Sequence, residues 1–175
     1  MIEKSIWTIG HSKHAIEHFL SIVRDASIEC VVDVRRFAGS KRQPQFGQKN
    51  LQSSLQEIEV SYIHLPDLGG RRKKRADDSP NHGWRVESFN AYADYMLTES
   101  FQSALSKLEE IATDQATAIM CAEAVPWRCH RRLIADALIV RDWAVWDIFA
   151  QSRIKEHQLT DFAQVEDHRL TYPAI

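Results

Sequence analysis

Residues 117–140 read TAIMCAEAVPWRCHRRLIADALIV, and this stretch decides the fold. The apolar run ending at Cys121 predicts a buried strand, and the apolar residues of 133–138 recur at helical spacing. In parallel α/β proteins the loop after such a strand binds ligands, because free N–H groups at the next helix start can hold an anion. The loop and helix start carry Cys121, Glu123, Arg128, Cys129, His130, Arg131 and Arg132. We expect the function to reside here.

Strands and helices alternate on both sides of this stretch. Further strands are predicted at 5–9, 30–34, 60–65 and 144–149, and helices near 15–25, 50–57, 88–97 and 100–113. This alternation predicts a single α/β domain over residues 1–175, with a largely parallel sheet of about five strands and helices on both faces. We expect a basic mobile loop at about 66–86 and an irregular C-terminal tail from about 151.

Polar residues follow several of the predicted strands. His11 and Ser12 follow the first strand, and Asp33 and Arg35 end the second. Parallel crossovers are almost always right-handed, so the exits of successive strands lie at one edge of the sheet. These segments and the loop after Cys121 are therefore expected to form one polar, basic rim.

The composition is that of an ordinary globular protein. The chain has 175 residues, of which 44% are hydrophobic and 26% are charged, which argues against disorder. It contains no apolar run of about 18 residues and no signal-peptide pattern, so we expect a cytoplasmic protein without a membrane partner. The net charge of −2 conceals segregation, since 12 of the 22 Lys and Arg fall in 35–42, 71–75 and 128–132.

The three cysteines allow different interpretations. Cys121 is a candidate nucleophile, because a helix start and nearby arginines would favour its thiolate, but the residue type alone favours a small core residue at a strand end. Cys129 falls on the helix face of 133 and 137, which favours core packing. Cys30 lies within an apolar strand and is expected in the core. An odd count argues against a disulfide framework.

Other site candidates carry alternatives of the same kind. Glu123 is a possible general acid or base, or else a capping carboxylate at the helix start. His130 and His11 are candidates for proton transfer or hydrogen bonding to the loop, or exposed residues. Asp33 is expected to pair with an arginine more than to catalyse.

A set of polar side chains could hold an anion at this rim. A guanidinium offers a rigid fork for phosphate or carboxylate. The expected anion ligands are Arg35, Arg128, Arg131, Ser12 and His130.

The basic run 71–75, which includes Arg71 and Arg72, is a solvated loop or a nucleic-acid contact. Trp84 follows it and could stack on a base, while the cations would contact the backbone phosphates. The spacing of Cys121, Cys129 and His130 lacks the second close pair of a structural zinc site, and no nucleotide fingerprint occurs. We therefore expect no metal and no cofactor.

Several motifs point to a known family. In chain order they are TIGHS at 8–12, VVDVRRF at 31–37, PQF at 44–46, LGGRR at 68–72, FNAYADYM at 89–96 and MCAEAVPWRCHRRLIADAL at 120–138. On these motifs the chain is identified as a member of the bacterial family catalogued as domain of unknown function 488. The resemblance implies no activity, because none is established for the family.

The chain departs from the pattern of that family at Ala38, where a proline is expected, and at Asp147, where a histidine is expected. A weaker likeness is to rhodanese and cysteine-phosphatase folds, in which a loop after a strand-ending cysteine wraps an anion. The phosphatase loop has five residues between cysteine and arginine, whereas six separate Cys121 from Arg128. This likeness concerns architecture alone.

Three functions remain open from the sequence. The first is a small enzyme, a hydrolase or transferase dependent on Cys121 or Glu123, which acts on a phosphate-containing or nucleic-acid-derived anion. The second is a non-catalytic nucleic-acid-binding module that uses the 71–75 run. The third is a rhodanese-like sulfur carrier with a persulfide on Cys121. The sequence does not predict the oligomeric state.

Overall fold

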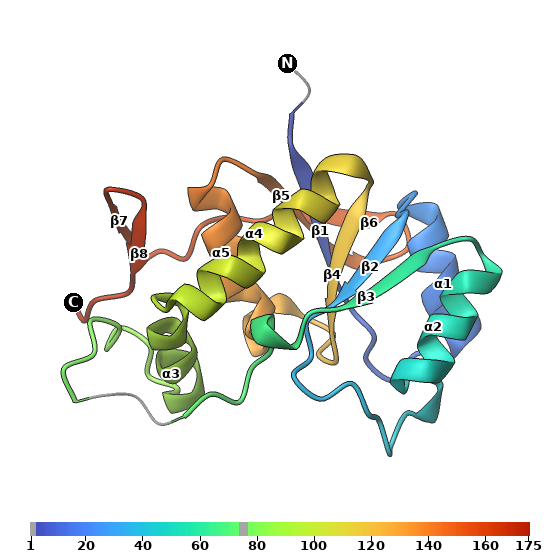
Figure 1. Ribbon diagram of the computed structural model, residues 1–175, viewed down its shortest axis with the longest axis horizontal. Helices are drawn as coiled ribbons and strands as arrows, with labels where there is room; N and C mark the ends of the chain where they lie inside the picture. The colour runs from blue at the N-terminus through green and yellow to red at the C-terminus, as the bar shows by residue number, and fades with distance from the viewer. Residues whose placement is uncertain (1–2, 74–76) are drawn as a thin grey trace.

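A six-stranded sheet forms the middle layer of the molecule in the computed structural model, which describes residues 3–73 and 77–175 (Figure 1). Its strands are β1 (Ser5–Gly10), β2 (Cys30–Asp33), β3 (Ser61–His64), β4 (Thr117–Cys121), β5 (Ala144–Ala150) and β6 (Arg153–Glu156). They lie in the order β3-β2-β4-β1-β5-β6, with the first five parallel and β6 antiparallel to β5. The expected largely parallel α/β sheet is confirmed.

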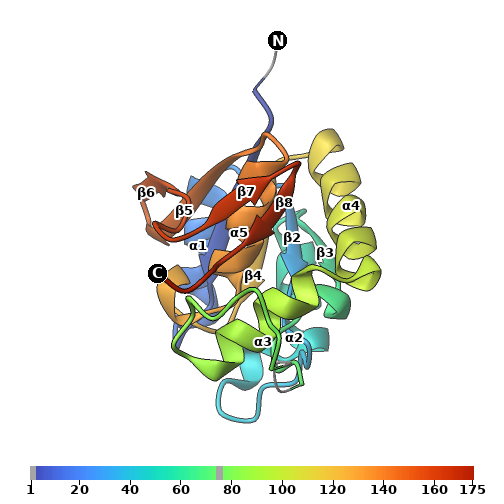
Figure 2. The same ribbon diagram turned by 90° about the vertical axis from the view of Figure 1, so that its left-hand side faces the viewer.

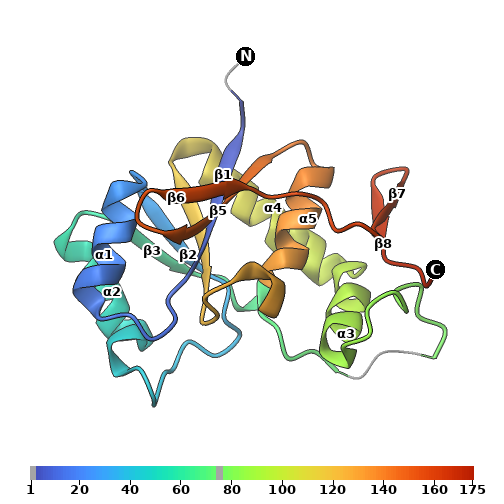
Figure 3. The same ribbon diagram turned by 180° about the vertical axis from the view of Figure 1, so that it is seen from behind.

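Helices cover both faces of this sheet (Figures 1 and 3). They are α1 (Ile16–Asp25), α2 (Gln48–Glu57), α3 (Glu87–Met96), α4 (Glu99–Asp114) and α5 (Arg131–Val140). Adjacent strand residues point to opposite faces, so β4 contributes Met120 to the core beneath α1 and α2 and Ile119 to the core beneath α4 and α5. Within the described chain no helix combines the length and apolar character needed to cross a bilayer.

The strand register brings the predicted exits together. Gly10 of β1 pairs with Cys121 of β4, and Asp33 of β2 pairs with Met120 of β4 and His64 of β3. The carboxyl ends of four parallel strands thus lie level with one another. The loops that leave them border one region of the surface.

The prediction of an irregular C-terminal tail is wrong. The tail forms β6 and a two-stranded hairpin of β7 (Gln164–Glu166) and β8 (Arg169–Thr171), which Figure 2 views from its end of the molecule. All residues of β6 and β7 are exposed, so no burial pattern marks them in the sequence. The hairpin turns at Asp167 and His168, both with positive φ, as a tight two-residue turn requires.

The expected basic loop at 66–86 is anchored over part of its length. Pro66–Leu68 forms a 3₁₀ turn, and Asn81 is fully buried. The Asn81 Nδ2 donates to Asp94 Oδ1 of α3 at 2.8 Å, and its Oδ1 accepts from the Tyr172 backbone N–H at 2.9 Å. Lys74 and Arg75, part of the predicted basic run, lie outside the described residues.

Candidate functional site

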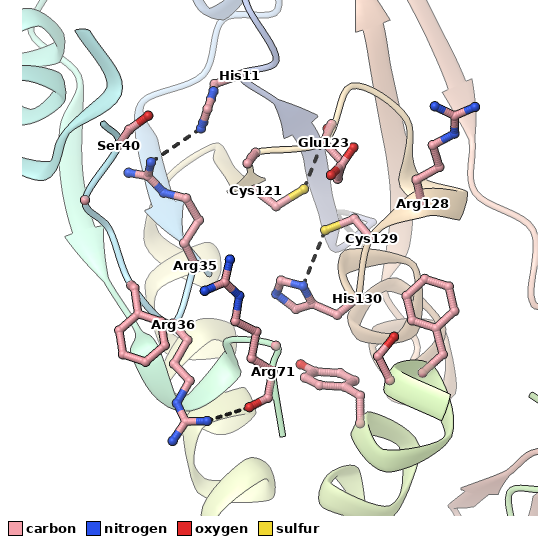
Figure 4. A pocket seen from close by; sticks show the side chains of 17 residues that line it. His11, Arg35, Arg36, Ser40, Arg71, Cys121, Glu123, Arg128, Cys129 and His130 are labelled. Carbon is pink, nitrogen blue, oxygen red and sulfur yellow. Dashed lines mark hydrogen bonds between the residues drawn. The ribbon is translucent and has the colours of Figure 1, made fainter. Parts of the chain in front are cut away.

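A pocket of about 410 Å³ opens at the carboxyl ends of β1, β2 and β4 (Figure 4). Its lining includes His11, Arg35, Arg36, Phe37, Ser40, Arg71, Tyr92, Cys121, Glu123, Arg128, Cys129 and His130. Most of the predicted site residues thus meet in one place. Ser12, Asp33, Arg72, Trp84 and Arg131 do not line it.

Cys121 ends β4 and is only 1% exposed, yet it borders the pocket. Its Sγ lies 3.7 Å from the Glu123 backbone oxygen, so the loop turns back over the sulfur. The same oxygen crowds Gly10, where an added Cβ would lie 1.6 Å from it. Glycine at this position therefore permits the close approach of the β4 loop to β1.

The surroundings of Cys121 favour its thiolate. Burial acts most strongly and opposes ionisation, but the hydrogen bond from Cys129 and the Arg131 guanidinium outweigh it, so the pKa of Cys121 falls below its usual value. Cys129 is affected oppositely, since burial and the neighbouring Cys121 raise its pKa well above the ordinary value. Of these two thiols, Cys121 is the one that ionises first.

Cys129 was expected in the core, and it is both buried and part of the pocket wall. Its Sγ lies 3.4 Å from His130 Nδ1, and Figure 4 shows the sulfur atoms of Cys121 and Cys129 directed toward one another. Cys30 lies wholly in the core, and burial raises its pKa to about 11. It takes no part in the site.

His130 lines the pocket as a half-buried, neutral imidazole rather than as an exposed residue of the helix start. Its Nε2 lies 2.9 Å from the Val34 carbonyl oxygen, which can only accept, so Nε2 carries the proton and Nδ1 is an acceptor. Burial, more than any other factor, lowers the pKa of His130 to about 4. The ring packs against Tyr92 at a centroid distance of 5.2 Å.

His11 is held in a comparable way. Its Nδ1 donates to the Ser12 carbonyl oxygen at 2.8 Å, which leaves Nε2 as an acceptor 3.4 Å from Arg35 Nη1. The ring stacks on Phe46 at 4.3 Å, and burial lowers the pKa of His11 to about 4. His11 therefore fixes Arg35 as a neutral acceptor. Ser12 contributes its backbone here, and its side chain lies away from the pocket.

Arg35 is the rigid cation of the pocket. Its Nε and Nη2 donate to the two Asp33 oxygens at 2.9 and 2.7 Å, in a bidentate ion pair. The Tyr62 hydroxyl also donates to Asp33. Asp33 thus positions Arg35 from behind, while Nη1 remains on the side of His11 and the pocket.

Arg131 does not bind at the pocket surface, contrary to its predicted role. It is completely buried, and its Nη1 donates to Thr8 Oγ1 at 3.2 Å and its Nη2 to the Glu123 carbonyl oxygen at 3.1 Å. Its Nε has no partner among residues 3–73 and 77–175. Arg131 therefore fastens the loop after β4 to β1 and supplies a buried positive charge near Cys121.

Three exposed arginines complete the rim. The Arg128 guanidinium makes no ion pair or hydrogen bond within the described part of the chain, and Arg36 Nη1 donates to the Arg71 carbonyl oxygen at 2.6 Å. Arg36 and Arg71 flank the ring of Phe37, at 5.5 and 6.0 Å from its centroid. Phe37 is 63% exposed at the pocket. Neither Arg36 nor Phe37 is among the predicted site residues, because nothing in the pattern of this loop indicates which side chains face the pocket.

Trp84 cannot serve as a base-stacking residue on the surface, since it is only 6% exposed. It packs in an aromatic cluster with Phe162 and Tyr172, and the Arg132 guanidinium lies 5.2 Å from its ring. The Arg72 guanidinium is also engaged in contacts within the protein. It stacks over Tyr95 at 3.7 Å and donates to backbone oxygens of residues 66–69.

A buried polar network that the sequence analysis missed lies behind Arg131. Thr8 Oγ1 donates to Asp147, whose other oxygen contacts His157 Nδ1 at 2.7 Å. His157 Nε2 in turn contacts Asp136 at 3.0 Å. Burial disfavours the charged ring, but the two carboxylates outweigh it and raise the pKa of His157 to about 9. Asp147, where the resemblance predicts a histidine, is thus a carboxylate partner in this network.

The pocket has a positive balance of charge. Four guanidinium groups and one carboxylate, Glu123, line it, and Asp33 offsets Arg35 from behind. The backbone N–H of Ala122 makes no hydrogen bond among the described residues. The part of the chain that the structure describes has no cluster of three or more His, Cys, Asp or Glu that could hold a metal ion. The residues that line the pocket therefore carry more positive than negative charge.

Comparison with known proteins gives one match. A family model described as "Domain of unknown function DUF488" matches residues 15–138, which covers most of the chain and includes Cys121, Cys129 and Arg35. His11 and Asp147 lie outside the matched range. Neither the curated proteins nor the solved structures provide a match. The chain therefore belongs to the family of domain of unknown function DUF488.

Proposed function

We propose that this protein is an enzyme that acts on a phosphate-containing or nucleic-acid-derived anion, with Cys121 as its nucleophile. The single observation that carries the proposal is the opening of an electrostatically favoured thiol into a pocket with excess guanidinium groups. The pocket volume of about 410 Å³ falls within the range usual for small-molecule sites. Arg35 and Arg128 are the proposed anion ligands.

The residues suggest a two-step reaction on a phosphate ester. The Cys121 thiolate attacks phosphorus, a sulfur–phosphorus bond forms, and the ester oxygen leaves and takes a proton from solvent. Water then attacks phosphorus, the Glu123 carboxylate accepts a proton from that water, and the thiolate is released with phosphate. Arg35 and Arg128 offset the negative charge on the phosphoryl oxygens in both steps.

The exposed ring of Phe37 is an argument for a substrate that carries an aromatic group. A nucleobase can stack on Phe37, while Arg36 and Arg71 lie close enough to contact its phosphate. This observation favours a nucleoside phosphate over a sugar phosphate. In the hypothesis of nucleic-acid binding, Phe37 takes the place of Trp84 as the residue that stacks on a base, and its flanking arginines contact the phosphates. The sulfur-carrier function stays a prediction, tested by mass spectrometry of Cys121 after thiosulfate treatment.

Calorimetric titration with inorganic phosphate and with nucleoside monophosphates tests the anion site. Arg128→Ala should weaken both ligands at least several-fold, because it removes an unpaired cation. Phe37→Leu should weaken the nucleotides and leave phosphate unchanged. Arg24→Ala is the matched control, since Arg24 is an exposed arginine of α1 outside this pocket.

Turnover is tested separately with a panel of phosphate esters. Cys121→Ser should abolish hydrolysis in the variant while phosphate binding persists, because serine is a far weaker nucleophile in this setting. Unchanged anion affinity in a double variant with Cys121→Ser and Arg128→Ala would refute the proposed site.

A further inference from the structure

We propose that Cys121 and Cys129 form a dithiol that reacts with hydroperoxides and closes to a disulfide. This reaction goes beyond the proposed hydrolytic function, in which Cys121 alone forms a covalent bond with the substrate. The two cysteines lie at opposite ends of one loop. The loop begins at Cys121, the last residue of β4, and Cys129 lies shortly before the start of α5. Both line the same pocket, so a molecule as small as a hydroperoxide meets both sulfurs there.

The two sulfur atoms point toward one another from opposite ends of the loop (Figure 4). The interaction with Cys129 is also one of the causes that lower the pKa of Cys121. The positions of both residues are fixed by neighbouring bonds, because Arg131 fastens the loop through the Glu123 carbonyl oxygen and His130 is bonded to Val34. The disulfide would therefore form between two residues whose positions the fold already holds in place.

The proton of Cys129 has two acceptors in this arrangement. One is the Cys121 sulfur, and the other is His130 Nδ1, which lies 3.4 Å away and carries no proton of its own. The two thiols differ in their tendency to ionise, as an attacking and a resolving cysteine require. Cys121 is the attacking thiolate, and Cys129 keeps its proton until the second step.

The chemistry proceeds in two balanced steps. The Cys121 thiolate attacks one oxygen of the hydroperoxide, a sulfur–oxygen bond forms, the oxygen–oxygen bond breaks, and the alkoxide or hydroxide takes a proton from solvent. Cys121 is thereby oxidised by two electrons to a sulfenic acid, and the peroxide is reduced. The Cys129 sulfur then attacks the Cys121 sulfur, the sulfur–oxygen bond breaks, and the departing hydroxide leaves as water with the Cys129 proton.

The sequence supplies a direct readout of this bond. Trypsin cleaves after Lys107, Arg128 and Arg131, so Cys121 lies in the peptide 108–128 and Cys129 in the peptide 129–131. The folded protein is treated with hydrogen peroxide, its remaining thiols are alkylated, and it is digested without reductant. We expect the two peptides joined, with the loss of two hydrogens, and separated again by dithiothreitol.

Two variants complete the test. In Cys129→Ser, Cys121 should accumulate as a sulfenic acid that dimedone traps, and Cys129→Ala serves if serine prevents folding. Cys30→Ala is the matched control and should still form the link. Peptides that stay separate while Cys121 is oxidised to sulfinic acid, or a link that forms only in denaturant, would overturn the proposal. Neither outcome bears on phosphate binding, which is measured independently.

Discussion

At the scale of single residues, Arg131 and Arg128 show how differently two arginines of one loop can act. Arg131 is fully buried and holds the Glu123 carbonyl oxygen and Thr8, whereas Arg128 is exposed at the pocket. A buried cation without a carboxylate in direct contact favours any anion that forms beside it. In this protein the Cys121 thiol lies nearby, and Arg131 is one of the groups that lower its pKa.

Arg131→Met should therefore change both stability and reactivity. The Glu123 carbonyl oxygen would lose a charged donor, which costs about 1–3 kcal/mol of the free energy of unfolding. The pKa of Cys121 should also rise, because one of the groups that lowers it is gone. Urea denaturation measures the first effect, and the pH dependence of Cys121 alkylation measures the second.

Arg128→Met is the matched control for this change. The Arg128 side chain is exposed, so its removal should alter the free energy of unfolding by no more than about 0.5 kcal/mol. If Arg131→Met behaved as Arg128→Met does in both measurements, the structural role assigned to Arg131 would be wrong.

The sequence identified the residue types of the site better than their orientations. The loop residues Cys121, Glu123 and Arg128 line the pocket where the strand-exit argument expects them. Arg131 and Trp84 lie in the interior, because packing of a tertiary core, which no local pattern records, decides which side of a turn faces water. His157 was missed for the same reason, since its partners lie 10 and 21 residues away in the chain.

At the scale of elements, the contact between β1 and the loop after β4 determines the shape of the site. Gly10→Ala would place a Cβ 1.6 Å from the Glu123 carbonyl oxygen, so the loop must move. We expect a loss of about 1–3 kcal/mol in the free energy of unfolding, as for overpacked cores. The altered loop should also change the alkylation rate of Cys121.

Gly39→Ala provides the comparison for that variant. Gly39 borders the same pocket, but an added Cβ there meets nothing within 4 Å. Its stability and Cys121 reactivity should stay close to those of the wild type. Equal effects of the two substitutions would show that loss of glycine flexibility, rather than the close approach at Gly10, is responsible.

The buried elements were predictable, and the exposed ones were not. β2 and β4 are covered on both faces and read as apolar runs, so the sequence indicates them directly. β6, β7 and β8 are short, and hydrogen bonding to a neighbouring strand defines them more than burial does. The strand order also depends on which face of the sheet each connection between parallel strands covers. No local sequence pattern indicates that face.

At the scale of the whole molecule, buried histidines should give stability a maximum near pH 6.5. His11 and His130 have pKa values lowered to about 4, so the unfolded chain binds more protons below 6.5 and stability falls as the pH drops from 6.5 toward 4. His157 acts oppositely. Its stabilising contribution is complete below 6.5 and is lost as the pH rises through about 9.

The free energy of unfolding should fall by about 3 kcal/mol on the alkaline side. This value follows from the difference between the pKa of His157 in the folded protein, about 9, and its ordinary pKa of 6.5. Urea denaturation from pH 4 to 10 measures the profile. His157→Gln should be less stable at pH 6.5 and should lack the decline between 6.5 and 9. A wild-type stability that increases through that range would contradict the charged His157 between its two carboxylates.

The central claim is that Cys121 is an accessible thiolate within the folded protein, and the rate of its alkylation as a function of pH tests this most directly. Peptide mass spectrometry separates Cys121 from Cys129 and Cys30, and no substrate is needed. The account predicts that Cys121 reacts first, that its rate persists well below the ordinary thiol pKa of about 8.5, and that inorganic phosphate slows it. A Cys121 that reacts only when the protein unfolds would contradict the account.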